Sequence, residues 1–129
     1  MHEKPHGQTG LKRIWFAFLY SVNGLRFAFT KETAFQQEAC LYLILLVILY
    51  FLPLSIIFKC VLFSANTLVL IVEILNSAIE SIVDMTSPDY HDYAKRAKDL
   101  GSAAVLMSIA LAIVLWLCAI CIVWLGKGV

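Results

Sequence analysis

Three long apolar stretches dominate the pattern of hydrophobic and polar positions along the chain. Residues 39–58 and 100–126 contain no Lys, Arg, Asp or Glu, and residues 60–83 contain only two glutamates. A helix that crosses a bilayer needs about 20 consecutive, mostly apolar residues. The pattern therefore predicts three membrane-spanning helices, over residues 34–52, 61–83 and 101–125.

Polar segments separate these spans. Pro53 and Ser55 break the chain after the first span, and Lys59 is the single charge that we expect in the turn that follows. Residues 84–100, which include Pro88 and seven Asp, Lys or Arg side chains, are predicted to form a polar loop before the third span.

Residues 11–31 combine aromatic side chains with basic ones. On a helical wheel Lys12, Asn23, Arg26 and Thr30 share one arc, although aromatic residues interrupt it. We interpret this segment as an amphipathic helix at the membrane surface. The alternative is that it begins a spanning helix.

The composition also indicates a membrane protein. Of the 129 residues 61% are hydrophobic and 15% are charged, whereas soluble domains are about 45–50% apolar and about 25% charged. This excludes an ordinary soluble domain, a disordered chain and a nucleic-acid-binding arm. We expect one domain, residues 1–129, whose three spans enclose too little volume for a polar site without a second copy.

Basic residues are concentrated on one side of the predicted spans. Residues 1–31 contain five, residues 84–100 contain three, and the opposite side has only Lys59 and Lys127. Because Lys and Arg are enriched in cytoplasmic segments, we expect the N-terminus in the cytoplasm and the C-terminus outside.

The second span contains a stripe of polar side chains. In VEILNSAIESIVD, the spacing of Glu73, Asn76, Glu80 and Asp84 places them within an arc about 80° wide around a helix. Ionisable residues inside a span are costly and indicate function by default, although a structural polar seam is the alternative. Their ligand atoms are oxygens, which suit Mg²⁺ rather than zinc.

Depth distinguishes the carboxylates. Glu73 lies further from water and is the candidate general base, whereas Glu80 lies nearer the interface and can hold a metal ion. Glu32, at the cytoplasmic start of the first span, can complete the metal site. Glu38 is six residues further, about 120° around a helix, so we do not expect it to share a ligand set with Glu32.

The segment KRAKD, residues 95–99, brings three cations to the same cytoplasmic level. Cations beside oxygen ligands for Mg²⁺ favour a polyphosphate, but membrane anchoring alone also requires Lys and Arg here. Gly101 and Ser102 lead into the third span, where a helix N-terminus can face the phosphates. The chain has no G-x-x-x-x-G-K-[ST] loop and no kinase catalytic loop, so nucleotide chemistry would use a different fold.

Two other classes of function remain. A small proton-coupled transporter also needs a membrane glutamate, but it would place its polar groups near the bilayer midplane rather than at one face. A non-enzymatic assembly subunit would not explain four polar residues on one stripe.

Three segments resemble the prokaryotic diacylglycerol kinase family of small membrane enzymes: ETAFQQE, VEILNSAIESIVD and HDYAKRAKDLGSAAV. The similarity extends from about Thr9 to the end of the third span. It implies an all-α homotrimer with a surface helix and three spans per chain, in a bacterial inner membrane with the C-terminus periplasmic. It further implies sites shared between subunits, which use Mg²⁺ and ATP to phosphorylate diacylglycerol to phosphatidate in phospholipid recycling.

Matching motif positions implies a role for each site residue. Glu73 is the general base, Glu32 and Glu80 hold the metal, and Asn76 supports the site. The other nucleotide contacts are Arg13, Tyr20, Asp89, Tyr90, His91, Lys98 and Asp99. The other lipid contacts are Arg26, Ala34, Phe35, Glu38, Ser102 and Trp116.

Two positions depart from the family pattern. Gln36 and Asn23 stand where the family often has Arg and Lys, which removes positive charge near the headgroup level. A related branch phosphorylates undecaprenol and usually has a His-containing segment after the first Glu. Because TAFQQE lacks histidine, we expect diacylglycerol as the substrate, with undecaprenol as the nearest alternative.

Overall fold

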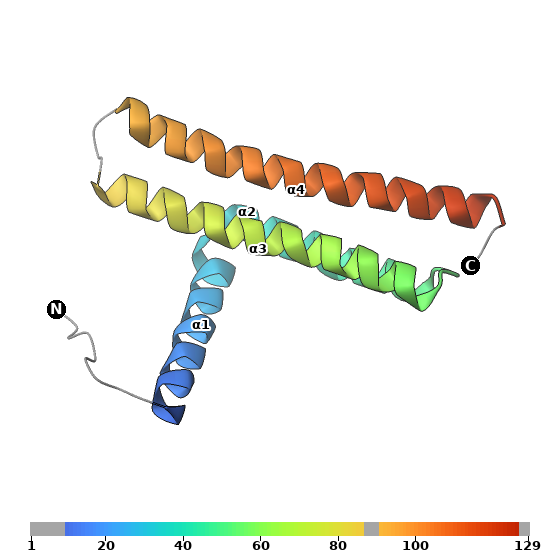
Figure 1. The fold of residues 1–129 in the computed structure, drawn as a ribbon, viewed down its shortest axis with the longest axis horizontal. Helices are drawn as coiled ribbons and strands as arrows, with labels where there is room; N and C mark the ends of the chain where they lie inside the picture. The colour runs from blue at the N-terminus through green and yellow to red at the C-terminus, as the bar shows by residue number, and fades with distance from the viewer. Residues whose placement is uncertain (1–9, 87–90, 127–129) are drawn as a thin grey trace.

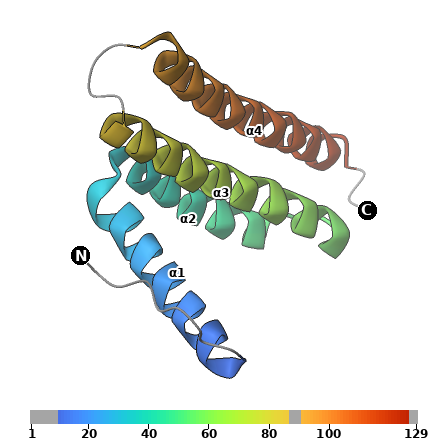
Figure 2. The same ribbon diagram turned by 60° about the vertical axis from the view of Figure 1, so that its left-hand side comes forward.

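The computed structural model describes residues 10–86 and 91–126, which form four helices (Figure 1). The helices are α1 (Leu11–Lys31), α2 (Thr33–Phe51), α3 (Ile56–Thr86) and α4 (Asp92–Trp124). Helices α2, α3 and α4 run side by side, whereas α1 leaves this bundle at a steep angle (Figure 1 and Figure 2). The all-α architecture expected from the sequence is confirmed.

Helices α2, α3 and α4 are each long and apolar enough to cross a membrane. They match the three predicted spans, but α3 has 31 residues and α4 has 33. The predicted polar loop over 84–100 is wrong for most of its length, because residues 84–86 continue α3 and residues 92–100 begin α4. Lys, Arg and Ala favour helix, and Asp92 in the first turn stabilises the N-terminus of α4.

Residues 52–55 separate α2 from α3, as Pro53 predicted. The Ser55 hydroxyl accepts a hydrogen bond of 3.3 Å from the Phe58 backbone N–H, which satisfies a free donor at the start of α3. The expectation that Lys59 lies in this turn is wrong, since it lies in the first turn of α3. Its Nζ donates to the Tyr50 backbone oxygen at 3.0 Å, so a cation pairs with the C-terminal end of α2.

The corner between α1 and α2 forms at Glu32, whose backbone is extended (φ −96°, ψ 102°). Phe35 is 2% exposed, packs against Ala28, and meets the Phe29 ring edge to face at 4.9 Å between centroids. Gln36 Nε2 also donates to the Phe29 backbone oxygen at 3.1 Å. This corner excludes the alternative that residues 11–31 begin the first span.

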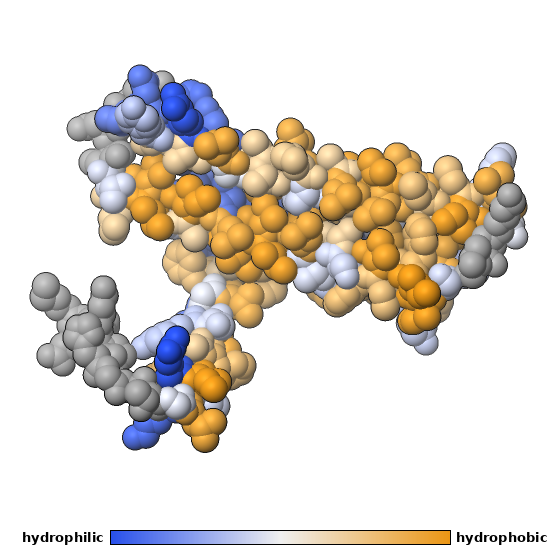
Figure 3. Space-filling view, viewed as in Figure 1, coloured by the Kyte–Doolittle hydropathy of each residue, from blue (hydrophilic) through white to orange (hydrophobic). Residues whose placement is uncertain are grey.

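Large apolar side chains face outward over much of the bundle. In Figure 3 hydrophobic residues cover most of the visible face, and hydrophilic residues gather where α3 ends and α4 begins, and on α1. The buried clusters are small: one consists of Ala28, Phe35 and Ala39, and the other of Leu49, Leu62 and Ala119. A single chain therefore presents a surface suited to lipid or to other membrane helices.

Candidate active site

A cavity of about 310 Å³, here called the site cavity, lies between α2, α3 and α4 toward the polar end of the bundle. Its lining includes four glutamates: Glu32, Glu38, Glu73 and Glu80. The other lining residues are Ala34, Asn76, Ser77, Ser102 and Val105. Residues from all three predicted spans therefore meet at one cavity within a single chain.

Three of the four stripe residues of α3 line this cavity. Glu73 is 5% exposed and Asn76 is 8% exposed. Asn76 Nδ2 donates to Glu80 Oε1 over 3.3 Å, which orients that carboxylate. Asp84, the fourth stripe residue, instead accepts a hydrogen bond of 2.7 Å from Lys98 Nζ. The stripe thus divides into a cavity part and a part that connects α3 to α4.

A close approach between α3 and α4 fixes the Asn76 side chain. Gly101 is buried, and a Cβ added there would overlap Asn76 Oδ1. Within the described residues Asn76 Oδ1 has no hydrogen-bond partner, so packing against Gly101 orients it while Nδ2 reaches Glu80. The absence of a side chain at Gly101 gives a physical basis for the supporting role expected of Asn76.

Glu32 and Glu38 line the same cavity although the helical wheel separated them. The wheel assumes one continuous helix, but Glu32 has an extended backbone and only Glu38 lies in α2. The 120° angle therefore does not apply to this pair. Glu38 Oε2 is buried and has no hydrogen-bond partner among the described residues.

Lys98 and Asp99 lie near the start of α4 and are not part of the cavity lining. Lys98 pairs with Asp84 on α3, and Asp99 pairs with Lys95 one turn earlier on α4. Both pairs are exposed, and such pairs contribute little to stability. The lysine of such a pair can exchange its carboxylate for a phosphate oxygen, which forms the same kind of charge-assisted hydrogen bond.

Three other predicted nucleotide residues, Arg13, Tyr20 and His91, are not part of the lining of the site cavity. His91 is the N-cap of α4, where its Nδ1 accepts a hydrogen bond of 3.2 Å from the Tyr93 backbone N–H. Arg13 and Tyr20 are exposed along α1. Asp89 and Tyr90 lie outside the described residues.

The predicted lipid residues are also dispersed. Ala34, Glu38 and Ser102 line the site cavity. Arg26 is exposed on α1, and Phe35 is buried in the corner between α1 and α2. Trp116 lines a separate, deeper cavity. One chain therefore gathers only part of the expected lipid contacts.

The sequence reasoning missed two residues of the cavity lining, Ser77 and Val105. A signal for both was available. Ser77 follows Glu73 by four residues and Val105 follows Ser102 by three, and residues at these spacings share one face of a helix.

The negative charge of the glutamates that line the site cavity favours the binding of a cation. Its four carboxylates repel one another when ionised, and no Lys or Arg lies among the described lining residues. Within residues 10–86 and 91–126, no three His, Cys, Asp or Glu side chains are grouped to hold a metal ion. Mg²⁺ is commonly bound by one or two carboxylates together with substrate phosphates, and two of these glutamates fit that arrangement.

Comparison with known proteins places the chain in a family. The family model for prokaryotic diacylglycerol kinase matches residues 19–120. Diacylglycerol kinase of Escherichia coli K12 is 48% identical over 108 residues, covering 84% of this chain and 88% of that protein. Diacylglycerol kinase of Pseudomonas aeruginosa is 43% identical over 110 residues, covering 85% and 89%. One from Helicobacter pylori is 36% identical over 114 residues, covering 88% and 89%. The chain therefore belongs to the prokaryotic diacylglycerol kinase family.

Proposed function

We propose that the chain is an ATP-dependent diacylglycerol kinase, which converts ATP and 1,2-diacylglycerol to ADP and phosphatidate. The observation that carries this proposal is a cavity with four glutamates at the polar end of three spanning helices, in a member of this family. A transporter would place its polar groups near the bilayer midplane. The relatives are named diacylglycerol kinase, which supports diacylglycerol over undecaprenol.

Glu73 acts as the general base. The lipid hydroxyl oxygen attacks the γ-phosphorus of ATP while Glu73 accepts the hydroxyl proton. The bond from the γ-phosphorus to the oxygen that bridges the β-phosphate breaks, and ADP leaves. Phosphoryl transfer depends mainly on positioning and on charge stabilisation, so the buried place of Glu73 matters as much as its basicity.

Glu32 and Glu80 would hold the Mg²⁺ ion that accompanies the nucleotide. When bound, the ion supplies charge neutralisation at the phosphates. Asn76 keeps the Glu80 carboxylate oriented through its 3.3 Å hydrogen bond. Lys98 and Asp99 contact ATP once their ion pairs with Asp84 and Lys95 have exchanged.

The active enzyme is a homotrimer whose sites combine residues of neighbouring subunits. Arg13 and Tyr20 are exposed on α1, outside the cavity of their own chain, which supports this sharing. The enzyme lies in the bacterial inner membrane, with its N-terminus and the polar end of the bundle on the cytoplasmic side. The excess of Lys and Arg at that end supports this orientation.

A phosphorylation assay tests the proposed reaction. The purified protein in mixed micelles receives Mg-ATP labelled at the γ-phosphate and diacylglycerol, undecaprenol or no lipid alcohol. Label should appear in phosphatidate when diacylglycerol is present. Labelling of undecaprenol alone would overturn the substrate assignment, and labelling of neither would overturn the kinase.

Mixing inactive chains tests the shared sites. Glu73→Gln subunits and Lys98→Ala subunits should each be inactive, and mixed trimers should regain part of the activity if one site uses these residues from different chains. Reassembly of each variant with wild-type chains is the control. Failure of every pairwise mixture of inactive site variants would contradict sharing.

A further inference from the structure

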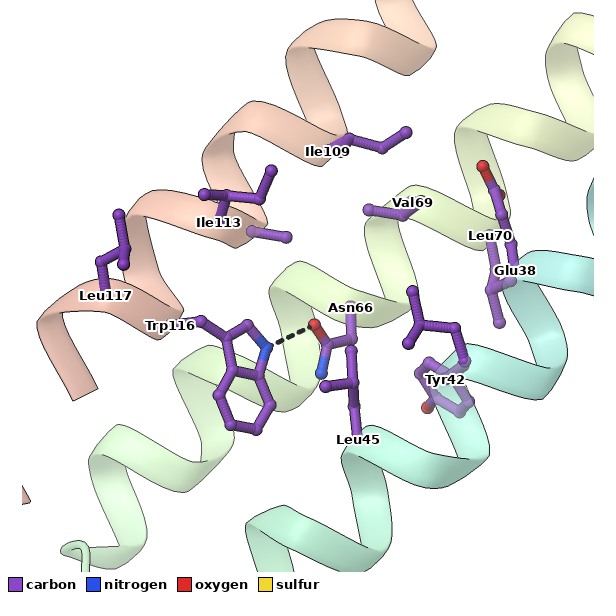
Figure 4. Close-up of a pocket in the computed structure, with 12 residues that line it drawn as sticks. Glu38, Tyr42, Leu45, Asn66, Val69, Leu70, Ile109, Ile113, Trp116 and Leu117 are labelled. Atoms are coloured by element: carbon purple, nitrogen blue, oxygen red, sulfur yellow. Dashed lines mark hydrogen bonds between the residues drawn. The ribbon is translucent and has the colours of Figure 1, made fainter. Parts of the chain in front are cut away.

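A second cavity, of about 320 Å³, lies deeper between the same three helices (Figure 4). We call it the deep groove. Side chains within residues 38–45 of α2 and 109–117 of α4 form its walls, and Asn66, Val69 and Leu70 of α3 lie between them. Each wall extends over about 10 Å, since a helix rises about 1.5 Å per residue.

Glu38 connects the two cavities, because it lines both the site cavity and the deep groove. Most other side chains of the deep groove are apolar. A ligand whose polar head lies in the site cavity can therefore extend a hydrocarbon tail past Glu38 into apolar surroundings. Burial of such a tail is favourable, whereas burial of an unpaired polar group is costly.

Asn66 is an unexpected residue in this apolar setting. It is 4% exposed, and its Oδ1 accepts a hydrogen bond of 3.0 Å from Trp116 Nε1, drawn as a dashed line in Figure 4. Its Nδ2 has no hydrogen-bond partner among the described residues. Because an unpaired buried donor is costly, apolar packing alone does not account for an amide at this position.

The orientation of Trp116 does account for it. The indole is partly buried, packs against the cluster of Leu49, Leu62 and Ala119, and reaches from α4 toward Asn66 on α3 (Figure 4). Trp116 and Glu38 line different ends of the walls of the deep groove. The hydrogen bond thus fixes a large flat side chain at the end away from the glutamates.

We propose that Asn66 is a positioning residue for lipid binding, because its hydrogen bond fixes the Trp116 indole as the end wall of a groove that takes one acyl chain. This inference rests on the proposed function, since the chain enters the deep groove only when the lipid hydroxyl lies beside Glu73. The ligand class is a long hydrocarbon chain attached to a polar head that carries a hydroxyl group.

A kinetic comparison tests the role of Asn66. Asn66→Leu should raise the KM for dioleoylglycerol about fivefold, the effect of losing one hydrogen bond of moderate strength, while kcat and the KM for Mg-ATP stay within about twofold. Ser64→Ala is the control, because it removes a 2.8 Å hydrogen bond on the same helix, from Ser64 Oγ to the Cys60 backbone oxygen, and Ser64 does not line the deep groove. The control should leave the KM for lipid unchanged, and equal effects of the two variants would overturn the inference.

A double-mutant cycle separates positioning from general destabilisation. Trp116→Phe removes the donor and keeps a ring. If the hydrogen bond acts through Trp116, the double variant Asn66→Leu, Trp116→Phe should have the same KM for lipid as Trp116→Phe alone. Effects that multiply would show that Asn66 acts independently of Trp116, and would overturn the inference.

Fluorescence measures occupancy of the groove without turnover. The chain has three tryptophans, so Trp15→Phe with Trp124→Phe leaves Trp116 as the single emitter. Diacylglycerol brominated within its acyl chains should quench Trp116 more strongly than the same amount of brominated phosphatidylcholine, and Asn66→Leu should reduce this difference. Equal quenching by both lipids would mean contact with bulk lipid only, and would overturn the inference.

The kinase function and the role of Asn66 can be refuted by different results. If wild-type protein phosphorylates no diacylglycerol, the proposed function is wrong. If it phosphorylates diacylglycerol while Asn66→Leu matches wild type in the KM for lipid, only the role of Asn66 is wrong.

Discussion

The site cavity and the deep groove are nearly equal in size, about 310 and 320 Å³, and are built by the same three helices. Their linings are opposite in character: the site cavity has four glutamates, and the deep groove has Glu38 alone. On α3, Glu73 of the site cavity and Asn66 of the deep groove are seven residues apart and lie on one face of the helix. A simple bundle can therefore form a reactive site and a binding groove by changing polarity along a single face.

The two cavities should have distinct kinetic signatures. Substitutions in the site cavity should change turnover or nucleotide binding, and substitutions in the deep groove should change lipid binding. The following changes, from the largest expected effect to the smallest, test that division from the side of the site cavity.

Replacing Glu73 should have the largest effect on turnover. Glu73→Gln keeps the size of the side chain but removes the proton acceptor, so kcat should fall by about 10²–10⁴-fold. Removing a buried carboxylate should leave the protein no less stable. Nucleotide binding and bromolipid quenching of Trp116 should persist. A near-normal kcat would refute the assignment of the base. Lost quenching would show that Glu73 also affects lipid binding in the deep groove, against the separate roles of the two cavities.

Replacing Glu80 should act on the metal instead. Glu80→Gln should raise the KM for Mg-ATP by about 10–100-fold, the range typical of disturbed metal sites, and excess Mg²⁺ should ease the defect. Titration of activity with Mg²⁺ at fixed ATP measures this, and full activity in excess EDTA would refute the metal site. If excess Mg²⁺ restored the activity of Glu73→Gln but not that of Glu80→Gln, Glu73 would be the metal ligand and Glu80 the general base.

A methyl group at Gly101 should disturb the site indirectly. Gly101→Ala forces Asn76 to move, because the new Cβ would overlap Asn76 Oδ1. Overpacking costs about 1–3 kcal/mol, and we expect kcat/KM for Mg-ATP to fall about tenfold as Glu80 loses its orientation.

Gly24 supplies the matched control for this change. It lies within α1, and a Cβ there meets nothing within 4 Å. Gly24→Ala should raise helix stability by about 1 kcal/mol and leave kinetics unchanged. Equal losses of activity in the two variants would show that the close approach at Gly101 is unimportant.

The smallest effect is expected from Asp84. Asp84 pairs with Lys98 at 2.7 Å and therefore competes with a phosphate for that cation. Asp84→Asn should lower the KM for Mg-ATP about twofold at low salt, and high salt should reduce the difference because exposed pairs are screened. Asp92→Asn removes the same charge from the first turn of α4 and is the control. An increased KM would instead identify Asp84 as a support for Lys98.

The sequence predicted the elements that depend on periodicity and composition. The helix over 11–31, three helices long and apolar enough to span a membrane, and the break at Pro53 all follow from residue patterns, and the structure has them. The stripe of Glu73, Asn76 and Glu80 was also predicted correctly, because positions on one straight helix follow from spacing alone.

The errors have physical causes. Residues 84–100 were assigned to a loop because they are charged, but charge does not oppose helix formation once a helix leaves the apolar region. The helical wheel gave a wrong angle between Glu32 and Glu38 because the chain turns at Glu32. Asn66 was missed, although it lies seven residues before Glu73 on the same face, because its importance depends on Trp116 fifty residues later.

The length of α3 has a consequence for how the enzyme meets its substrate. At about 1.5 Å per residue its 31 residues extend about 46 Å, against about 30 Å for the hydrocarbon core, so its polar end reaches the headgroup layer. A lipid can then react without leaving the bilayer, and it arrives by lateral diffusion in two dimensions. The rate therefore depends on the fraction of membrane lipid that is substrate, and dilution with inert phospholipid slows the enzyme even when the total amount of substrate is constant.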